Sequence, residues 1–262
     1  MEFTKMHGAG NDFIVFEGDT DGDYGALSLK LCHRRFSVGA DGLMVTRVVD
    51  ERTIRMVYYN SDGTRGQMCG NGARCLAYFA YKKGLVRHRD FILETDAGRV
   101  EAAILEEDLV EIAMGHPVTD SPFERYFFDE EITVADRSFH MSYILMGVPH
   151  VVLELESLDK REVLQLGPRI ETMPLFTQKA NVNFVKVLDK GHVMIDTWER
   201  GAGNTLACGT GALASVYVLN RLGRLEPHVR VDAPGGTLWV RIDPARGVFL
   251  QGGAVVAFEG RI

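Results

Sequence analysis

The chain has few cysteines and no long apolar run. Its four cysteines, at positions 32, 69, 75 and 208, are too few and too widely spaced for the disulfide framework of a small secreted domain. No apolar run approaches the length that spans a bilayer, and no basic and apolar export signal precedes Met6. We therefore expect reduced thiols, a cytoplasmic location and no membrane partner.

Basic residues are also in the minority. The chain has 29 lysines and arginines against 36 acidic residues, a formal net charge of −7. Non-specific nucleic-acid binding needs a basic face, so no nucleic-acid partner is expected. With 262 residues, of which 46% are hydrophobic and 25% charged, the chain has the composition of a folded protein with one large domain or two ordinary ones.

Two cysteines each open the same run of small residues. The first run is Cys69–Arg74 (CGNGAR) and the second is Cys208–Leu213 (CGTGAL). The residues that follow, up to Lys83 and Leu222, are mostly apolar. Each segment stops at a glycine, the residue preferred in the left-handed position after a helix. We predict a helix after each cysteine, and because the first is apolar nearly all round, we expect it to be buried.

Other landmarks repeat around the two helices. Asn60 precedes Cys69 by nine positions and Glu199 precedes Cys208 by nine. Strand–turn–strand patterns follow at 94–100 and 231–238, which favours a duplicated unit over two coincidentally glycine-rich turns. Elsewhere we predict short strands, as at 3–16 and 43–59, and a helical segment at 28–36.

The predicted crossing between the two halves is the stretch 115–122. Its two prolines disfavour continuous regular structure. The sequence therefore predicts an N-terminal half of residues 1–116 plus about 252–262, and a C-terminal half of 117–251.

A thiol at the start of a helix is suited to proton transfer. The free N–H groups of the first turn and the helix dipole favour the thiolate, which predicts a lowered thiol pKa. The same N–H groups bind anions such as an amino acid's α-carboxylate and stabilise a carbanion-like transition state. With Cys69 as thiolate and Cys208 as thiol, or the reverse, the pair supplies a base and an acid on opposite faces of one carbon. Cys75 and Cys32 carry no predicted role.

Further motifs make the chain resemble the diaminopimelate epimerases. The resemblance covers the whole chain, and its motifs besides the cysteine runs are MHGAGNDF at 6–13, YNSDG at 59–63, GVPH at 147–150, ANVNF at 180–184 and ERGAG at 199–203. It implies an epimerase that works without pyridoxal phosphate or any other cofactor and converts LL-diaminopimelate to the meso form, for lysine and peptidoglycan synthesis. The family often forms dimers, so a homodimer is an expectation.

The resemblance also implies a fold and a set of site residues. The fold class is α+β, with two pseudo-symmetric domains, each a mainly antiparallel curled sheet around a central helix, and the active site in the cleft between them. Cys69 and Cys208 match the two proton-transfer thiols. His150 and Glu199 match groups that tune the pKa values of the thiols. The substrate-binding set comprises Asn11, Asn60, Gly70, Asn71, Asn181, Glu199, Arg200, Gly209 and Thr210. Arg200 offers a bidentate fork for the distal carboxylate of the substrate, and Glu199 can accept from its distal ammonium.

Two positions depart from one common form of the family. Val148 stands where many members carry a substrate-contacting asparagine, and Gly42 stands where some carry glutamine. The valine removes a polar contact but leaves the proton chemistry intact. A racemase of the same architecture for histidine, lysine or a broad range of amino acids is therefore an alternative. A proline racemase is disfavoured because that family places a histidine soon after the first Cys-Gly, and here Asn71 follows Gly70.

Two other classes of protein compete with this interpretation. A thiol redox or metal-binding module is disfavoured because Cys69 and Cys208 lie in no Cys-x-x-Cys pair and no His/Cys cluster is present, so no metal is expected. A pyridoxal phosphate enzyme would need a Schiff-base lysine, and no lysine stands in a context that suggests one.

Overall fold

A computed structural model describes all residues from Met1 to Ile262. The chain forms two compact units, Met1–Ala113 with Gln251–Ile262 and Met114–Leu250. The boundaries drawn on the sequence, after 116 and after 251, lie close to these. None of the four helices is long and apolar enough to cross a membrane.

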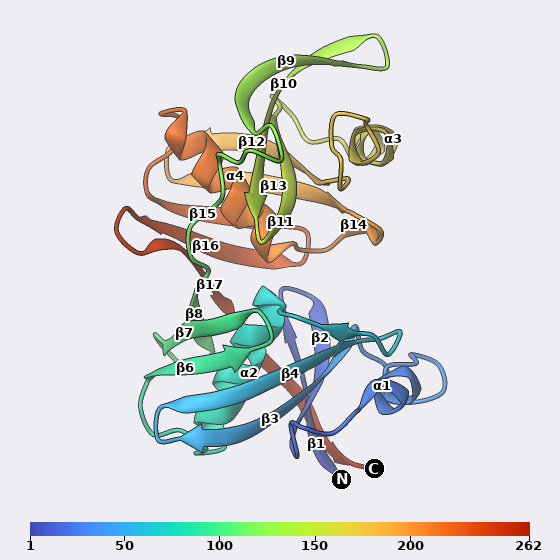
Figure 1. The fold of residues 1–262 in the computed structure, drawn as a ribbon, viewed down its shortest axis with the longest axis vertical. Coiled ribbons are helices and arrows are strands. Elements are labelled where there is room, and N and C mark those ends of the chain that lie inside the picture. The colour runs from blue at the N-terminus through green and yellow to red at the C-terminus, as the bar shows by residue number, and fades with distance from the viewer. The chain divides into compact units, whose positions relative to one another are not determined.

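The N-terminal unit is a curled sheet around one helix (Figure 1). Its strands pair in the order β18-β1-β2-β3-β4-β6-β7-β8, with parallel pairs at β2–β3 and β4–β6 and antiparallel pairs elsewhere. The elements are β1 (Glu2–Gly8), β2 (Asn11–Glu17), α1 (Gly25–Leu31), β3 (Gly42–Asp50), β4 (Thr53–Asn60), β5 (Arg65–Gly66), α2 (Gly70–Lys82), β6 (Asp90–Thr95), β7 (Gly98–Ile104), β8 (Leu109–Ala113) and β18 (Val255–Arg261). Helix α2 contacts β1, β2, β3, β4, β7 and β8, so the sheet wraps it.

The C-terminal unit repeats this arrangement. Its strands pair in the order β9-β10-β11-β12-β13-β15-β16, again with two parallel pairs, β11–β12 and β13–β15. The elements are β9 (Phe127–Val134), β10 (Arg137–Met146), β11 (Val148–Glu154), α3 (Lys160–Glu171), β12 (Asn181–Asp189), β13 (His192–Glu199), β14 (Gly203–Thr205), α4 (Gly209–Arg221), β15 (His228–Ala233) and β16 (Gly236–Asp243). Strand β17 (Gly247–Gly253) begins in this unit and ends in the N-terminal one. The matching order of strands and helices confirms the predicted duplication and the α+β class.

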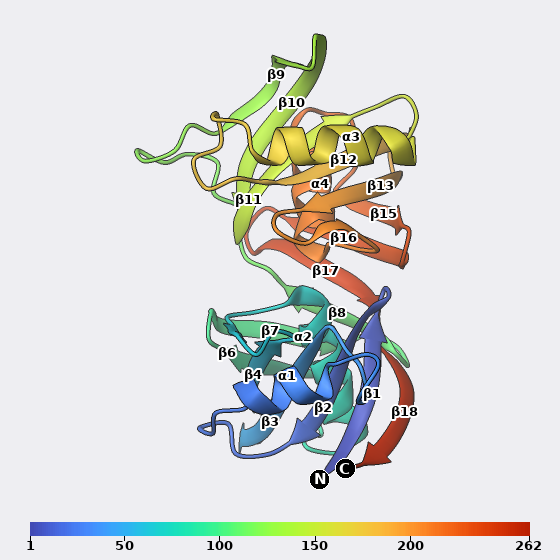
Figure 2. The ribbon, with the colours of Figure 1, turned by 90° about the vertical axis from the view of Figure 1, so that its right-hand side faces the viewer.

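Strand pleating places the two helices of each unit on opposite faces of its sheet. Alternate residues of a strand point to opposite faces. In β3, Leu43 and Val45 pack with Leu31 of α1, whereas Met44 faces Gly72 of α2. In β12, Val182 and Phe184 pack with α3, while their neighbour Asn183 faces α4. Figure 2 shows α1 and α3 on the outside of their units.

The two central helices begin and end as the sequence predicts. Residues from Asn71 to Ala80 are all buried, so α2 is a core helix. Both helices end in a Schellman motif. Leu85 N–H donates to Ala80 and Gly84 N–H to Tyr81, with Gly84 at φ +71°. The corresponding bonds at the end of α4 involve Gly223 at φ +74°.

The predicted helical segment at 28–36 is only partly correct. Helix α1 ends at Leu31, and the chain then turns back through Gly39, whose N–H donates to the Leu31 carbonyl. Arg34, which a longer helix would carry, instead pairs with Asp12 and Asp41, both 2.6 Å away. Ion pairs with residues outside the segment therefore decide where the helix stops.

Helix α3 was not predicted. Its N-cap is Asp159, whose carboxylate accepts from the Arg161 N–H at 2.8 Å. Gly167 and Pro168 interrupt the helical pattern of the sequence. The glycine is required by packing, because a Cβ there would lie 2.6 Å from the ring of Trp198.

We expect Gly211→Ala to destabilise the protein by about 1–3 kcal/mol through overpacking. A Cβ at 211 would overlap Asn183 Oδ1, and hydrogen bonds with Val151, His150 and Thr197 hold that amide. The matched variant, Gly72→Ala, meets mainly the end of the Met44 side chain, which is unbranched and can adopt another rotamer, and should cost less. Urea unfolding of both variants checks this, and equal losses would contradict it.

Candidate functional site

Each predicted proton-transfer cysteine is the N-cap of the central helix of its unit. Cys69 has an extended backbone, φ −137° and ψ 119°, and its carbonyl accepts from Ala73 N–H at 2.7 Å. Cys208 has φ −114° and ψ 109°, and its carbonyl accepts from Ala212 N–H at 3.0 Å. In neither case does the thiol cap the helix by a side-chain hydrogen bond. Both thiols are reduced.

In the N-terminal unit, asparagines surround Cys69. Asn11 Oδ1 accepts from Cys69 Sγ at 3.7 Å and from Asn71 Nδ2 at 3.3 Å. Asn11 Nδ2 donates in turn to Asp41 Oδ2 at 2.8 Å. The β1–β2 turn at Ala9 and Gly10, both with positive φ, delivers Asn11 to this place. The structure therefore brings three of the predicted site residues of this unit into contact, and Gly70 follows at the start of α2.

Asn60 lies at the end of β4 in a tight turn. Its Nδ2 donates to Thr64 Oγ1 at 3.0 Å, and its carbonyl accepts from Ser28 Oγ at 2.8 Å. Asp62 accepts from the Thr64 N–H at 2.9 Å and holds the loop. The turn therefore gives Asn60 a structural role at the end of β4.

In the C-terminal unit, a carboxylate stands beside the thiol. Glu199 is the last residue of β13, and its Oε1 accepts from Thr205 Oγ1 at 2.5 Å. Glu199 is also hydrogen-bonded to Cys208. Cys208 Sγ lies 3.4 Å from Thr210 Oγ1, and Gly209 between them is buried. Cys208, Thr210 and Glu199 thus form one cluster at the start of α4.

The expectation of a lowered thiol pKa is wrong for Cys208. Burial raises the pKa of Cys208 well above its ordinary value, and the negative charge of Glu199 raises it further. The hydrogen bond with Thr210 favours the thiolate but is outweighed. Cys208 is 7% exposed, so loss of hydration dominates the effect of the helix terminus. Cys208 therefore rests as a thiol. Burial likewise raises the pKa of Glu199.

His150 lies beneath this cluster and is uncharged. Burial lowers its pKa to about 3, and the charge of Arg200 acts in the same direction. Its ring nitrogens lie 3.4 Å from Asn181 Nδ2 and 3.1 Å from Asn183 Nδ2. Through Asn183, whose Oδ1 lies against Gly211, the imidazole supports the first turn of α4. The structure places His150 against amides, so a charge-based effect on a thiol is not available to it.

Asn181 connects His150 to Arg200. Its Oδ1 accepts from the Arg200 backbone N–H at 2.7 Å. The Arg200 guanidinium is exposed and donates to the Gln178 carbonyl at 2.7 Å. One nitrogen of the fork expected to hold a distal carboxylate is therefore bonded to the protein backbone.

The two positions that depart from the family pattern, 148 and 42, have different surroundings. Val148 is half-buried at the start of β11, directly after Gly147 with φ +71°. At Gly42 a Cβ would overlap the ring of Tyr58, and at Gly66 a Cβ would lie 2.5 Å from the same ring. Tyr58 therefore fills the space that a side chain at position 42 would occupy. Its phenol is partly buried and interacts electrostatically with Cys69, which helps to raise the pKa of Tyr58.

Sequence reasoning missed several residues of these clusters. Asn183 lay in a quoted motif but was given no role, and Arg74 lay inside the first cysteine run. Thr205 and Tyr58 carried no sequence signal, because their contacts depend on strand register. No group of three or more His, Cys, Asp or Glu side chains is placed to hold a metal ion.

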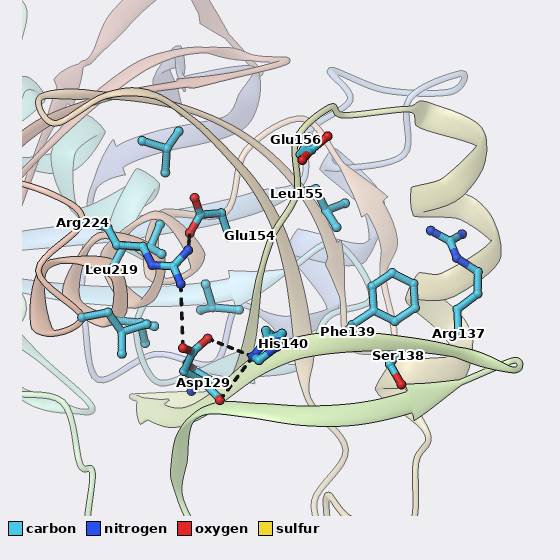
Figure 3. A pocket seen from close by; sticks show the side chains of 15 residues that line it. Asp129, Arg137, Ser138, Phe139, His140, Glu154, Leu155, Glu156, Leu219 and Arg224 are labelled. Atoms are coloured by element: carbon cyan, nitrogen blue, oxygen red, sulfur yellow. Dashed lines mark hydrogen bonds and ion pairs between the residues drawn. The ribbon is translucent and has the colours of Figure 1, made fainter.

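A separate cavity of about 720 Å³ opens on the C-terminal unit between β9, β10 and the end of α4 (Figure 3). Arg224 pairs there with Glu154 and Asp129, and His140 lies 3.4 Å from Asp129. None of the predicted site residues lines it. Four of its charged or titratable side chains are thus paired with one another, and Arg137 pairs with Glu162 outside the lining.

We expect Glu199→Gln to lower the pKa of Cys208, because a negative charge beside the thiol is removed. In a Cys69→Ser background, thiolate absorbance near 240 nm would then appear at lower pH. Glu171→Gln is a matched control, since Glu171 is buried in the same unit but bonds to Trp198 and Gly201. The prediction would be wrong if Glu199→Gln left the titration midpoint of Cys208 unchanged, or if the control moved it equally.

We expect Gly42→Gln alone to lower the free energy of unfolding by about 1–3 kcal/mol, because the new side chain overlaps Tyr58. Combining it with Tyr58→Ala should recover part of the loss, so the two changes are non-additive. Denaturant unfolding of both single variants and the double variant measures the coupling. Strict additivity would show that the ring does not fill this space.

Comparisons with known proteins identify the family of this chain. A family model described as diaminopimelate epimerase matches residues 3–119 and 142–257. A diaminopimelate epimerase from Caldanaerobacter subterraneus is 40% identical over 272 residues, covering 100% of this chain and 99% of that protein. A second, from Clostridium perfringens, is 40% identical over 274 residues, covering 99% and 98%.

Solved structures share the fold at low identity. A probable proline racemase from Agrobacterium radiobacter K84 matches with a TM-score of 0.72 and 14% identity, covering 100% of this chain and 92% of that one. A phenazine biosynthesis protein of the PhzF family from Bacillus anthracis matches with a TM-score of 0.72 and 15% identity, covering 100% and 98%. These confirm the expected fold, while the full-length sequence relatives decide the family. The chain belongs to the diaminopimelate epimerase family.

Proposed function

We propose that this chain epimerises LL-diaminopimelate to meso-diaminopimelate by proton transfer between Cys69 and Cys208. Its membership of the diaminopimelate epimerase family over nearly the whole chain supports the reaction. The observation that supports the mechanism is a cysteine N-cap on a buried helix in each of two matched units.

The reaction needs two proton transfers and no change of oxidation state. A thiolate removes the proton from the α-carbon, and the electron pair of the C–H bond is delocalised into the substrate carboxylate. The other thiol then donates its proton to the opposite face, which inverts the carbon and leaves the second sulfur as thiolate. Each turnover therefore exchanges the charge states of Cys69 and Cys208.

The helix termini supply the main electrostatic assistance. The first-turn N–H groups at Gly70–Asn71 and Gly209–Thr210 would bind the α-carboxylate, whose charge grows as the proton leaves. Glu199 and Arg200 would bind the distal amino-acid head, with Asn11, Asn60 and Asn181 as neutral partners. Because Cys208 rests as a thiol beside Glu199, it is ready to act as the acid.

Three finer points remain part of the proposal. The product would serve lysine and peptidoglycan precursor synthesis, as the family name indicates. A cytoplasmic location and a homodimer remain predictions from the sequence and the resemblance.

Proton exchange in deuterated water tests the two-thiol mechanism. We expect wild type to invert LL-diaminopimelate with deuterium incorporation at the inverted carbon. Cys69→Ser and Cys208→Ser should each lose on the order of 10²–10⁴-fold in kcat/KM for inversion. Cys32→Ala is the matched control, a buried cysteine with no proposed role, and it should retain inversion.

Two outcomes would overturn the proposal. Full inversion by either serine variant would remove the two-thiol mechanism. Faster racemisation of lysine or histidine than of LL-diaminopimelate, measured in the same assay, would remove the substrate assignment.

A further inference from the structure

Arg74 is a charged residue in the centre of the N-terminal unit. It lies on α2, five positions after Cys69, and its exposed fraction is 0%. The corresponding position of α4, five after Cys208, is Leu213. The duplicated helices therefore differ at this position by a full buried charge.

The guanidinium has little of the compensation that buried charges normally have. Its Nη2 donates to Asn71 Oδ1 at 3.0 Å, while Nε and Nη1 have no hydrogen-bond partner. No carboxylate forms an ion pair with Arg74. Burial accordingly lowers the pKa of Arg74, and the negative charges that thiolates at Cys75 and Cys69 would carry oppose that shift. An unpaired buried cation costs several kcal/mol, which points to a function for this residue.

The surrounding backbone is shaped to admit this side chain. A Cβ on Gly8, at the end of β1, would lie 3.1 Å from Arg74 Nη2 and 3.3 Å from the Asn71 carbonyl oxygen. Gly8 therefore leaves room for the guanidinium beside the first turn of α2.

Arg74 also determines how Asn71 is oriented. Because Arg74 donates to Asn71 Oδ1, the amide nitrogen of Asn71 faces Asn11 Oδ1 at 3.3 Å. Asn11 Oδ1 is the same atom that accepts from Cys69 Sγ. Asn71 Nδ2 and Cys69 Sγ thus both donate to one oxygen, so Arg74 acts on the sulfur through its charge rather than through this hydrogen bond.

The other titratable groups near Cys69 in this unit are neutral or already paired. Burial raises the pKa of Cys75 to about 12 and raises that of Tyr58 far above its ordinary value, so both are uncharged near neutral pH. Asp41 and Asp12, on the far side of Asn11, both pair with Arg34, and Asp12 also pairs with Lys5 at 2.7 Å. Arg74 is thus a fully buried positive charge with no carboxylate partner.

We propose that Arg74 is a positioning residue for epimerisation: its buried guanidinium orients Asn71 toward Asn11 and favours the thiolate form of Cys69. The inference rests on the proposed function for its catalytic meaning. It gives the two half-sites opposite polarity, with a cation behind Cys69 and a carboxylate, Glu199, beside Cys208.

The pH dependence of Cys69 alkylation tests this without substrate. In a Cys208→Ser background, iodoacetamide labelling of the Cys69 peptide is followed by mass spectrometry, while Cys32 and Cys75 are buried. We expect Arg74→Met to move the midpoint up by about one to three pH units, the effect of removing a neighbouring opposite charge. Arg74→Lys, which keeps the charge, should restore most of the shift. Leu213→Met, at the matching position of α4, should leave the midpoint unchanged.

An unchanged midpoint in a folded Arg74→Met protein would overturn the proposal, as would an equal shift from Leu213→Met. If Arg74→Met does not fold, the Cys69 midpoint of the Cys208→Ser protein by itself tests the proposal. A Cys69 midpoint at or above the ordinary thiol value of about 8.5 overturns the proposal, and a lower one supports it. Labelling needs no turnover. The experiment therefore distinguishes failure of the proposed epimerase function from failure of the proposed role of Arg74.

Discussion

Each unit wraps a curled sheet around one helix, and the first turn of a helix carries four N–H groups without partners in the helix itself. Most proteins place a serine, threonine, asparagine or aspartate there to accept one of these bonds. Here a cysteine takes the cap position twice, with no side-chain hydrogen bond to the helix. The helix end therefore remains available to an anion, with a sulfur atom at its edge.

Burial and neighbouring charges affect the two thiols differently. Cys208 is almost inaccessible and faces a carboxylate, so hydration loss and repulsion outweigh the helix terminus. Cys69 is partly exposed and is surrounded by amides, with an arginine behind them. Two copies of one supersecondary unit have thus acquired different electrostatics at equivalent atoms. For a reaction in which one sulfur starts charged and the other neutral, that asymmetry is useful.

Much of this architecture could be predicted from local patterns. The apolar stretches after Cys69 and Cys208, and the glycines that end them, mark α2 and α4 because burial and the Schellman motif depend on nearby residues. The end of α1 could not be predicted, because Arg34 leaves the helix for Asp12 and Asp41. Helix α3 could not be predicted, because Gly167 is required by packing against Trp198, a residue on strand β13. The pKa of Cys208 was misjudged for a similar reason, since a motif does not report the depth of burial.

The space around Arg74 has a counterpart in the other unit. Gly8 pairs with Asn11 at the end of the first hairpin, and Met146 pairs with Val148 at the matching place in the second. One unit thus combines the smallest residue with a long cation, and the other combines Met146 with Leu213, both buried apolar side chains. The two units thus differ at these positions in both side-chain volume and polarity. A lineage that exchanges the arginine for an aliphatic residue loses the closest of the contacts that a Cβ at position 8 would meet, so residues 8 and 74 should covary during evolution.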